Sequence, residues 1–383
     1  MDVEKLINRS VVNTEPLVSA YLHSKAYTAG IPVSATFELT ARCNFDCKMC
    51  YVHLLDTERC KTEEKRAEWC IETGKKAADQ GVVFLLLTGG EPLIRPDFKE
   101  IYTALTKLGF VISINTNAYL ITDEIIELFK QLPPTRINIT LYGACDSTYE
   151  AVTGVSAFSR VIINIKKLLS IGIDVRFNGS FTRLNAADAE KILNISRELN
   201  VHIKGTQYMF PQVLVGKNPG ENGCRLSSEE AAYRRVEWLK LIHTPDEYKK
   251  RLKAMQNGID AFELSCKEEC GDGKIRCRAG KSSVWINFRG EMCFCGVAGH
   301  PFSIDEYGFT GAWEKVKEFT DSIRTPAKCE TCKYRDICCV CAAACYTETG
   351  DFKKVPEYVC KMTEKIAQLI KKETERLVTE NGD

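Results

Sequence analysis

Cys43, Cys47 and Cys50 form the pattern C-x3-C-x2-C near the N-terminal end of the chain. Cysteine thiolates are the soft ligands that bind iron–sulfur clusters. Three thiolates from one short loop can bind three irons of a [4Fe–4S] cluster, which leaves the fourth iron with an open position. A catalytic zinc keeps one position open for a reactant in the same way. The spacing therefore indicates a cluster that binds a substrate and does chemistry on it.

The same loop has a second interpretation, a structural Cys3His zinc site completed by His53. Structural zinc sites usually combine a C-x2–4-C pair with a second pair farther along the chain. Here the three thiols share one loop, so a zinc site would have to stand alone. The pattern favours the iron–sulfur cluster over zinc.

The elements that position this loop are predicted by alternating strand-like and helix-like patterns. Gly81, Gly109 and Gly172 each follow a helical pattern and precede a strand, as C-terminal caps do. Six strand–helix units in series predict an α/β fold, a parallel sheet curved into a partial (β/α)6 TIM-like barrel that stops short of eight strands. The predicted strands are 36–39, 82–87, 110–114, 136–141, 173–178 and 201–208, and the predicted helices are 62–80, 97–108, 122–131, 158–171 and 186–199.

Two motifs follow neighbouring strands of this predicted barrel. Cys43 comes just after the first strand, and Gly89-Gly90-Glu91-Pro92 follows the second. Active sites of such barrels form from the loops at the carboxyl ends of the strands. The two glycines let a ligand approach the backbone, and the Glu91 carboxylate can accept a hydrogen bond from an ammonium group. We expect both motifs to face one site.

These two motifs resemble those of the radical S-adenosylmethionine (SAM) superfamily. The resemblance implies that SAM chelates the open iron through its amino and carboxylate groups, and that its amino group contacts the Gly-Gly-Glu-Pro edge. One electron from the reduced cluster would then cleave SAM to a 5′-deoxyadenosyl radical, which abstracts hydrogen from a substrate. The cofactor carries the hard chemistry, and the protein supplies position and shielding.

Other SAM contacts follow from the same resemblance. The family usually has an aromatic residue just before the third cysteine, where this chain has Met49, and Tyr51 comes just after it. Arg183 would pair with the SAM carboxylate as a fixed fork. Each polar residue that follows a strand is equally compatible with an ordinary surface loop. Besides the Gly-Gly-Glu-Pro motif, the candidate SAM contacts are Tyr51, Asn115, Asn117, Thr140 and Arg183.

The C-terminal region is rich in cysteine. Of the 19 cysteines in the chain, 12 lie between residues 266 and 360. The odd total, the long chain and the lack of a signal peptide favour metal or redox use over disulfides. The G-x4-C and C-x2-C-x5-C spacings of this region resemble the SPASM extension of radical SAM enzymes, which binds up to two auxiliary [4Fe–4S] clusters. Ribbon-type zinc sites are the alternative that a C-x2-C pair leaves open.

The resemblance also assigns the ligands of two auxiliary clusters. The nearer cluster lacks an obvious fourth ligand, because the family pattern expects a cysteine where this chain has Ala342. Cys341 and Cys345 flank that position, and Cys341 is the preferred choice. The other assigned ligands are Cys270, Cys277 and Cys295 for the nearer cluster, and Cys329, Cys332, Cys338 and Cys360 for the distal one.

We predict four parts of the chain. They are an N-terminal extension (1–34), a radical SAM partial barrel (35–215), a helical bridge (216–265) and a SPASM auxiliary-cluster domain (266–383). The hydrophobic content of 44%, the charged content of 27% and the net charge of +1 are ordinary globular values that suggest no nucleic-acid or membrane partner. No apolar run approaches membrane-spanning length and no secretory signal is present, so we expect a cytoplasmic protein.

The predicted function is that of a radical SAM oxidoreductase or maturase. We expect a peptide substrate, as in ribosomal peptide maturation, and an electron donor such as flavodoxin or ferredoxin. Residues 1–34 are too short for the leader-peptide recognition domain of many relatives, so a peptide would dock directly or need a separate recognition protein. Alternatives are a small-molecule dehydrogenase or a cofactor or antibiotic biosynthesis enzyme of the same superfamily, and a non-catalytic iron–sulfur or zinc protein.

Three further observations bear on the reaction. Sulfatase maturases carry a catalytic Asp after the G-x4-C cysteine, where this chain has Gly296, and this disfavours that activity. Cys224 and Cys145 are candidates for a thiol that donates a hydrogen atom, although each is also compatible with no role. The glycine- and asparagine-rich segment 216–223 is predicted to be a loop that caps the barrel.

Overall fold

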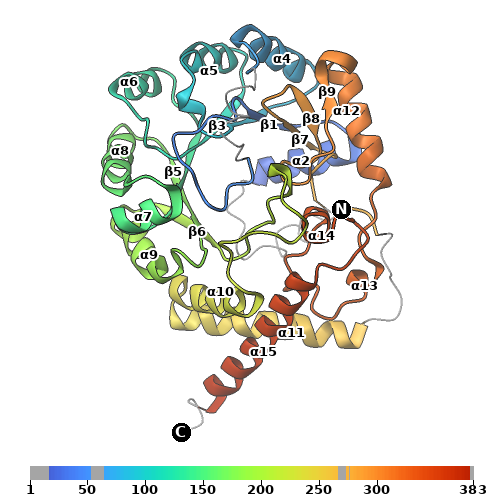
Figure 1. Ribbon diagram of the computed structural model, residues 1–383. Coiled ribbons are helices and arrows are strands. Elements are labelled where there is room, and N and C mark those ends of the chain that lie inside the picture. Colours follow the sequence, from blue (N-terminus) through green and yellow to red (C-terminus); the bar gives the residue numbers. More distant parts are fainter. Residues whose placement is uncertain (1–16, 53–63, 266–272, 276, 380–383) are drawn as a thin grey trace.

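The computed structural model describes residues 17–52, 64–265, 273–275 and 277–379. Its centre is a nine-stranded sheet in the order β6-β5-β4-β3-β2-β1-β7-β8-β9. The six strands from β1 to β6 are parallel and follow one another in the sheet as they do in the chain, which confirms the predicted partial barrel (Figure 1). They are β1 (Ser34–Glu38), β2 (Phe84–Thr88), β3 (Val111–Thr116), β4 (Arg136–Leu141), β5 (Val175–Ser180) and β6 (His202–Thr206).

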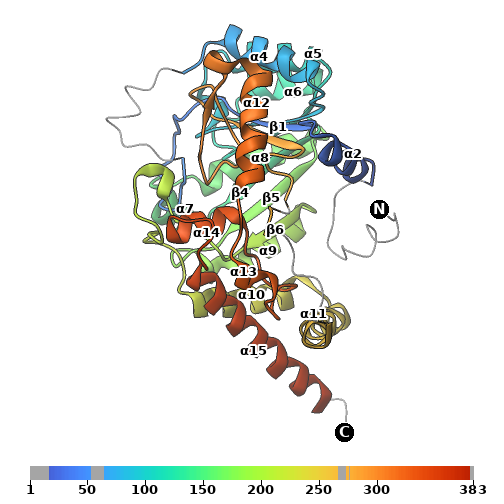
Figure 2. The ribbon, with the colours of Figure 1, turned by 90° about the vertical axis from the view of Figure 1, so that its right-hand side faces the viewer.

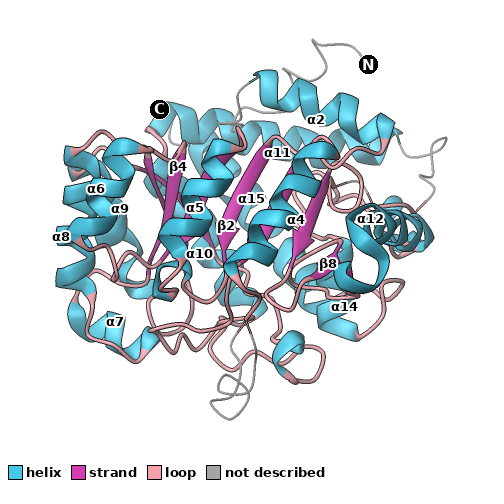
Figure 3. Ribbon diagram, turned by 90° about the horizontal axis from the view of Figure 1, so that it is seen from above, coloured by secondary structure: helices cyan, strands magenta, loops and turns pink. Residues whose placement is uncertain are grey.

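Helices cover the outer face of this curved sheet (Figures 1 and 3). Gly81, Gly109 and Gly172 follow three of them with φ values of +95°, +87° and +79°, the left-handed conformation that ends a helix and that glycine adopts without strain. The predicted helices are found as α4 (Ala67–Asp79), α5 (Phe98–Lys107), α6 (Asp123–Gln131), α8 (Phe158–Ser170) and α9 (Ala189–Glu198), and α7 (Asp146–Thr153) is an additional, unpredicted helix.

Along β3 and β4, apolar side chains that face the covering helices alternate with polar side chains that face the barrel interior. Ile112, Ile114, Ile137 and Ile139 are at most 2% exposed and belong to the main hydrophobic core, together with residues of the covering helices. Because successive strand residues point to opposite faces, the intervening positions of β3 and β4 point to the inside of the barrel. Those positions carry polar side chains, and the barrel interior is therefore available to a ligand.

The cysteine-rich region adds strands to the same sheet. β7 (Ser283–Ile286) pairs in parallel with β1, and β8 (Glu291–Cys293) and β9 (Phe302–Ser303) continue the sheet in antiparallel pairing. The sheet thus crosses the boundary at residue 266 that we predicted between the bridge and the SPASM domain. The first strand of the barrel is flanked on both sides, and the C-terminal region is hydrogen-bonded to it.

The remaining helices lie around the ends of the sheet. The bridge contains α10 (Ser228–Ile242) and α11 (Pro245–Ser265), and both pack against α15 (Glu357–Thr379), which projects from the body of the molecule (Figure 2). The others are α2 (Leu17–Ala29), α12 (Ile304–Ser322), α13 (Ala327–Glu330) and α14 (Ala342–Thr349). None of the helices in the described ranges has the length and apolar character needed to cross a membrane.

Candidate active site

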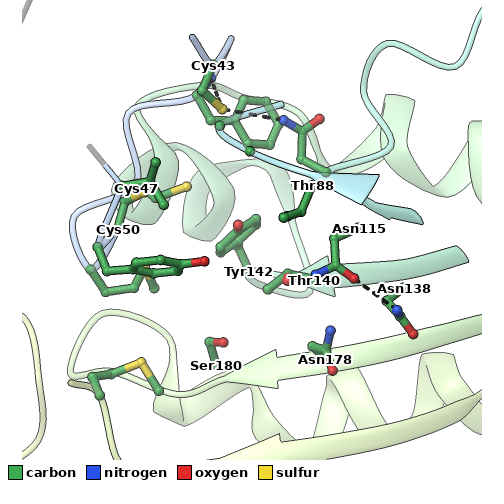
Figure 4. Close-up of a pocket in the computed structure, with 18 of the residues that line it drawn as sticks. Cys43, Cys47, Cys50, Thr88, Asn115, Asn138, Thr140, Tyr142, Asn178 and Ser180 are labelled. Carbon is green, nitrogen blue, oxygen red and sulfur yellow. Dashed lines mark hydrogen bonds between the residues drawn. The ribbon is translucent and has the colours of Figure 1, made fainter. Parts of the chain in front are cut away.

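The three cysteines of the N-terminal motif line one cavity. Cys43, Cys47 and Cys50 lie on the loop after β1, at the carboxyl ends of the strands, and border a cavity of about 370 Å³ (Figure 4). Backbone hydrogen bonds tie this loop to the end of α7, since the Asp46 and Lys48 amides donate to carbonyls of that helix at 2.7 and 3.0 Å. The loop conformation is therefore fixed by the barrel.

The Gly-Gly turn after β2 packs directly against the start of the cysteine loop. The amide of Gly90 donates to the carbonyl of Thr40 at 2.8 Å. A Cβ atom on Gly89 would lie 2.4 Å from the Thr40 carbonyl oxygen, and one on Gly90 would lie 2.3 Å from that of Arg42. Only glycine allows this approach. The two motifs border the same cavity, as their positions after neighbouring strands led us to expect.

Glu91 points away from the cavity. Its carboxylate accepts hydrogen bonds from the Thr116 hydroxyl and the Asn117 amide, both at 2.7 Å, and from the Leu93 amide at 3.1 Å. Burial raises the pKa of Glu91 to about 7 despite these three donors. The sequence suggested that Glu91 contacts an ammonium group directly. In the structure, its carboxylate instead links the loop after β2 to the end of β3. Pro92 also lies outside the cavity lining, where it starts the short helix η1 (Pro92–Ile94).

Polar side chains from successive strands form one side of the cavity (Figure 4). The Asn138 side-chain amide donates to the Asn115 side-chain oxygen at 2.9 Å. Asn138 lies within β4 and was not predicted, although its alternation with buried Ile137 and Ile139 signals an inward position. The lining residues on this side are Thr88, Asn115, Asn117, Asn138, Thr140, Asn178 and Ser180.

Aromatic and apolar side chains form another part of the wall. Tyr208 and Phe210 follow β6, and Tyr142 follows β4. Tyr51 lines the cavity too, and its ring packs edge-on against Trp285 of β7, with the centroids 6.5 Å apart. Val297, after β8, shows that the C-terminal region contributes to the wall. Of these residues, Tyr51 is among the candidate SAM contacts named from the sequence.

Three further predicted residues lie outside the cavity lining. Arg183 is exposed, and its guanidinium donates to the Gly223 carbonyl at 2.6 Å. Cys145 is exposed at the start of α7, and Cys224 is buried with its sulfur 3.3 Å from the Asn222 side-chain oxygen. The geometry therefore offers these three side chains no direct contact with a ligand in this cavity.

Comparison with known proteins identifies the barrel. Residues 37–196 match the model of the Radical SAM superfamily. The barrel is a radical SAM domain. It is 26% identical over 349 residues to an AdoMet-dependent heme synthase of Methanosarcina barkeri, covering 85% of this chain and 96% of that protein. It is 35% identical over 166 residues to a probable GTP 3′,8-cyclase of Saccharolobus solfataricus, a match that spans 43% of this chain and 53% of the cyclase.

Solved radical SAM structures share the fold. Streptococcus suis SuiB bound to the precursor peptide SuiA superposes with a TM-score of 0.63 at 19% identity, over 92% of this chain and 82% of SuiB. The enzyme anSMEcpe with bound AdoMet and the Kp18Cys peptide superposes with a TM-score of 0.65 at 14% identity, over 91% of this chain and 99% of that one. The chain is a radical SAM enzyme that uses a [4Fe–4S] cluster and SAM.

The residues of the cavity fit that cofactor pair. A zinc ion needs all its ligands within about 2.3 Å of one point, whereas a cubane cluster binds each thiolate at a different iron. The three thiols spread along one wall of a cavity suit a cluster, and the polar strand ends leave room for SAM. His53, the alternative zinc ligand, lies outside the described residues.

The cysteines of the SPASM-type region form two neighbouring groups. Burial, and then the charges of Cys341 and Cys277, raise the pKa of Cys295 to about 11, which places these three thiols near one another. A second group is made by Cys329, Cys332, Cys338 and Cys360. Burial, and then the charges of the other members of this group, raise the pKa of Cys329 and of Cys360. Cys345 is fully buried beside this second group. A cavity of about 370 Å³ lies between members of both groups. Cys270 lies outside the described residues.

Proposed function

We propose that this radical SAM enzyme modifies a peptide, with Cys43, Cys47 and Cys50 binding the catalytic cluster. The observation that carries the proposal is a cavity bordered by these thiols, by the Gly-Gly edge and by Val297 of the cysteine-rich region. A bound cluster with SAM supplies the radical chemistry of the family. The chain's own residues position the reactants and exclude water from them.

Different parts of the cavity lining are assigned to SAM and to the substrate. The backbone of Gly89 and Gly90 borders the cavity without side chains, so a ligand's amino group can approach its carbonyl groups closely. Amide and hydroxyl groups of Asn115, Asn138 and Thr140 can hydrogen-bond the polar groups of SAM. Tyr208 and Phe210 also line the cavity, and we assign them to the substrate. Arg183 is left out of this assignment because its guanidinium binds the Gly223 carbonyl.

Auxiliary clusters complete the proposed enzyme. We assign the nearer cluster to Cys277, Cys295 and Cys341, with Cys270 as a further candidate, because the first three are mutual neighbours. The distal cluster is assigned to the group that ends with Cys360. Clusters of this kind transfer electrons, and their potentials depend on burial and hydrogen bonding. An external donor such as flavodoxin or ferredoxin would reduce the enzyme.

A sulfatase-type mechanism is disfavoured by the space around Gly296. A Cβ atom on Gly296 would lie 2.5 Å from the indole of Trp285. An Asp at this position would therefore clash, and the chain cannot carry the base that sulfatase maturases use there. The peptide substrate is supported by the fold shared with SuiB and anSMEcpe, whose structures contain peptides.

A small-molecule substrate is the second candidate. It is favoured by the match to the AdoMet-dependent heme synthase, which extends over 96% of that enzyme. The alignment includes the C-terminal region as well as the barrel, so it concerns more than the SAM-binding part.

The decisive experiment uses anaerobically reconstituted protein, reduced and mixed with SAM and with short peptides encoded beside its gene. Formation of 5′-deoxyadenosine together with a mass change in one peptide would support the proposal. A control lacks SAM. If all such peptides remain unchanged, with or without an added leader-peptide recognition protein, while a small molecule from the same gene cluster is converted, the peptide assignment is wrong.

A further inference from the structure

A tyrosine in the cavity wall is held by a carboxylate of the cysteine-rich region. Tyr208 follows β6 and lines the cavity, and its hydroxyl donates to a carboxylate oxygen of Glu348 at 2.9 Å. The Phe210 ring packs edge-on against that of Tyr208, with the centroids 5.0 Å apart. The hydroxyl is thus directed at Glu348 and the ring forms part of the wall.

Glu348 is itself fixed by an ion pair. Both of its oxygens accept from the Arg225 guanidinium, at 2.7 and 3.2 Å, and its side chain is 4% exposed. The guanidinium carbon lies 4.0 Å from the centre of the Tyr358 ring, on α15. A buried pair with satisfied partners is costly to break by removing one member. The position of Tyr208 is therefore determined by contacts outside the barrel.

Glu348 belongs to α14, the helix that begins at the auxiliary cysteines. Cys341 is the N-cap of α14, and Cys345 lies within it. The segment that continues from Tyr208 also rests on this helix, because the Gly220 amide donates to the Thr347 carbonyl at 3.0 Å. Gln212, in the same segment, donates to the Cys50 carbonyl at 2.8 Å. One set of contacts thus links the two cysteine regions through the cavity wall.

The cavity wall is uncharged where the structure describes it. None of the described residues that border the cavity is an Asp, Glu, Lys, Arg or His. A charged substrate group placed against Tyr208 would lose its water without gaining an ion partner, which is costly. The charged end of SAM differs, because the family resemblance implies that the open iron of the cluster would bind it.

We propose that Glu348 is a positioning residue, and that the Tyr208 it holds forms a subsite for an uncharged, aromatic or aliphatic group of the substrate. This inference rests on the proposed function and names the substrate chemistry of the same cavity. Tyr208 contacts the substrate group directly, and Glu348 acts through the tyrosine hydroxyl.

The test measures binding of two probes to the reconstituted, SAM-bound enzyme: N-acetylphenylalanine amide and N-acetylaspartate amide. We expect the phenylalanine probe to bind at least about tenfold more tightly, which corresponds to about 1.4 kcal/mol. Glu348→Gln and Tyr208→Phe should each weaken its binding about fivefold, and the double variant should be no weaker than either, since both remove one link. Glu237→Gln is the matched control, because this carboxylate pairs with Arg234 on the exposed face of α10.

Several results would overturn the inference. They are equal binding of the two probes, no binding of the phenylalanine probe at millimolar concentration, additive losses in the double variant, or wild-type binding by Glu348→Gln. The change that SAM causes in the electron paramagnetic resonance spectrum of the reduced cluster is recorded in parallel. Its absence from the wild-type enzyme would instead contradict the proposed function, so the two failures are distinguishable.

Discussion

The side-chain nitrogen of Asn117 lies 3.8 Å from the sulfur of Cys43, within hydrogen-bond distance for sulfur, and 2.8 Å from the side-chain oxygen of Asn44. The Phe45 amide donates to the same sulfur at 3.4 Å. Hydrogen bonds to a cluster-binding thiolate stabilise the reduced cluster, which carries more negative charge. Asn117 thus lies where it can set the reduction potential of the proposed catalytic cluster.

We expect Asn117→Ala to lower that potential. A hydrogen bond worth about 1 kcal/mol corresponds to about 40 mV for one electron. Redox titration followed by electron paramagnetic resonance measures the shift, in a variant whose auxiliary clusters have been removed. Asn194→Ala, on the exposed face of α9, is the control. An unchanged potential would show that Asn117 does not bond the cluster ligand.

Replacing any one of Cys43, Cys47 and Cys50 with Ala should remove about four irons per chain, because each proposed ligand holds the one catalytic cluster. Formation of 5′-deoxyadenosine should fall more than about a hundredfold, since the loss of even an outer-shell partner costs 10–100-fold. Iron analysis and product quantification check this. Cys145→Ala should retain full iron, because Cys145 is exposed and outside the cavity lining. Retained iron in the Cys43, Cys47 or Cys50 variants would refute the ligand assignment.

The two candidate ligands on either side of Ala342 should behave differently. Cys341 neighbours Cys277 and Cys295, so Cys341→Ala should lose the nearer auxiliary cluster, about four irons per chain. Cys345→Ala should keep this iron and lose only packing. Mössbauer spectroscopy with iron analysis distinguishes the variants. The reverse pattern, with iron lost on replacing Cys345, would exchange their roles.

A methyl group on Gly90 should destabilise the protein. It would lie 2.3 Å from the Arg42 carbonyl oxygen and push the turn away from the cysteine loop. Overpacking of this kind costs about 1–3 kcal/mol. Gly223→Ala is the control, because nothing lies within 4 Å of a Cβ atom there. Thermal unfolding of both variants measures the difference, and equal midpoints would contradict the close packing of the two motifs.

Stability should depend on pH through Glu38, at the end of β1. Burial raises the pKa of this carboxyl from 4.5 to about 7. Between these values the folded chain keeps a proton that the unfolded chain releases, so stability is full at low pH and falls as the pH rises through this window. Glu91 contributes with the same sign. Glu38→Gln should therefore unfold with a shallower pH dependence than the wild type, as followed by thermal midpoints. An identical slope would show that Glu38 ionises normally.

The sequence predicted the parts of the fold that are specified locally. Six strands and five covering helices could be found because apolar periodicity and capping glycines repeat within each unit. The strands β7 to β9 were missed, since they are short and their partner, β1, is distant in sequence. Cys43 and Gly90 were placed correctly in one cavity by their positions after neighbouring strands.

Side-chain directions were predicted less well, because they depend on partners that sequence spacing does not show. Glu91 was expected to meet a ligand but is held by Thr116 and Asn117. Arg183 was expected at the cofactor and instead binds the Gly223 carbonyl. Tyr208 lies in the last predicted strand region. The direction of its side chain could not be predicted, because its hydroxyl binds Glu348, which belongs to a helix 140 positions farther along the chain.

The parallel pairing of β7 with β1 has a consequence for biosynthesis. The strand that leads into the proposed cluster-binding cysteines obtains its second neighbour only after the ribosome has made Ser283–Ile286. Pairings between remote segments form slowly. The sheet that carries the proposed cluster ligands Cys43, Cys47 and Cys50 is therefore completed late, when β7 pairs along the second edge of β1.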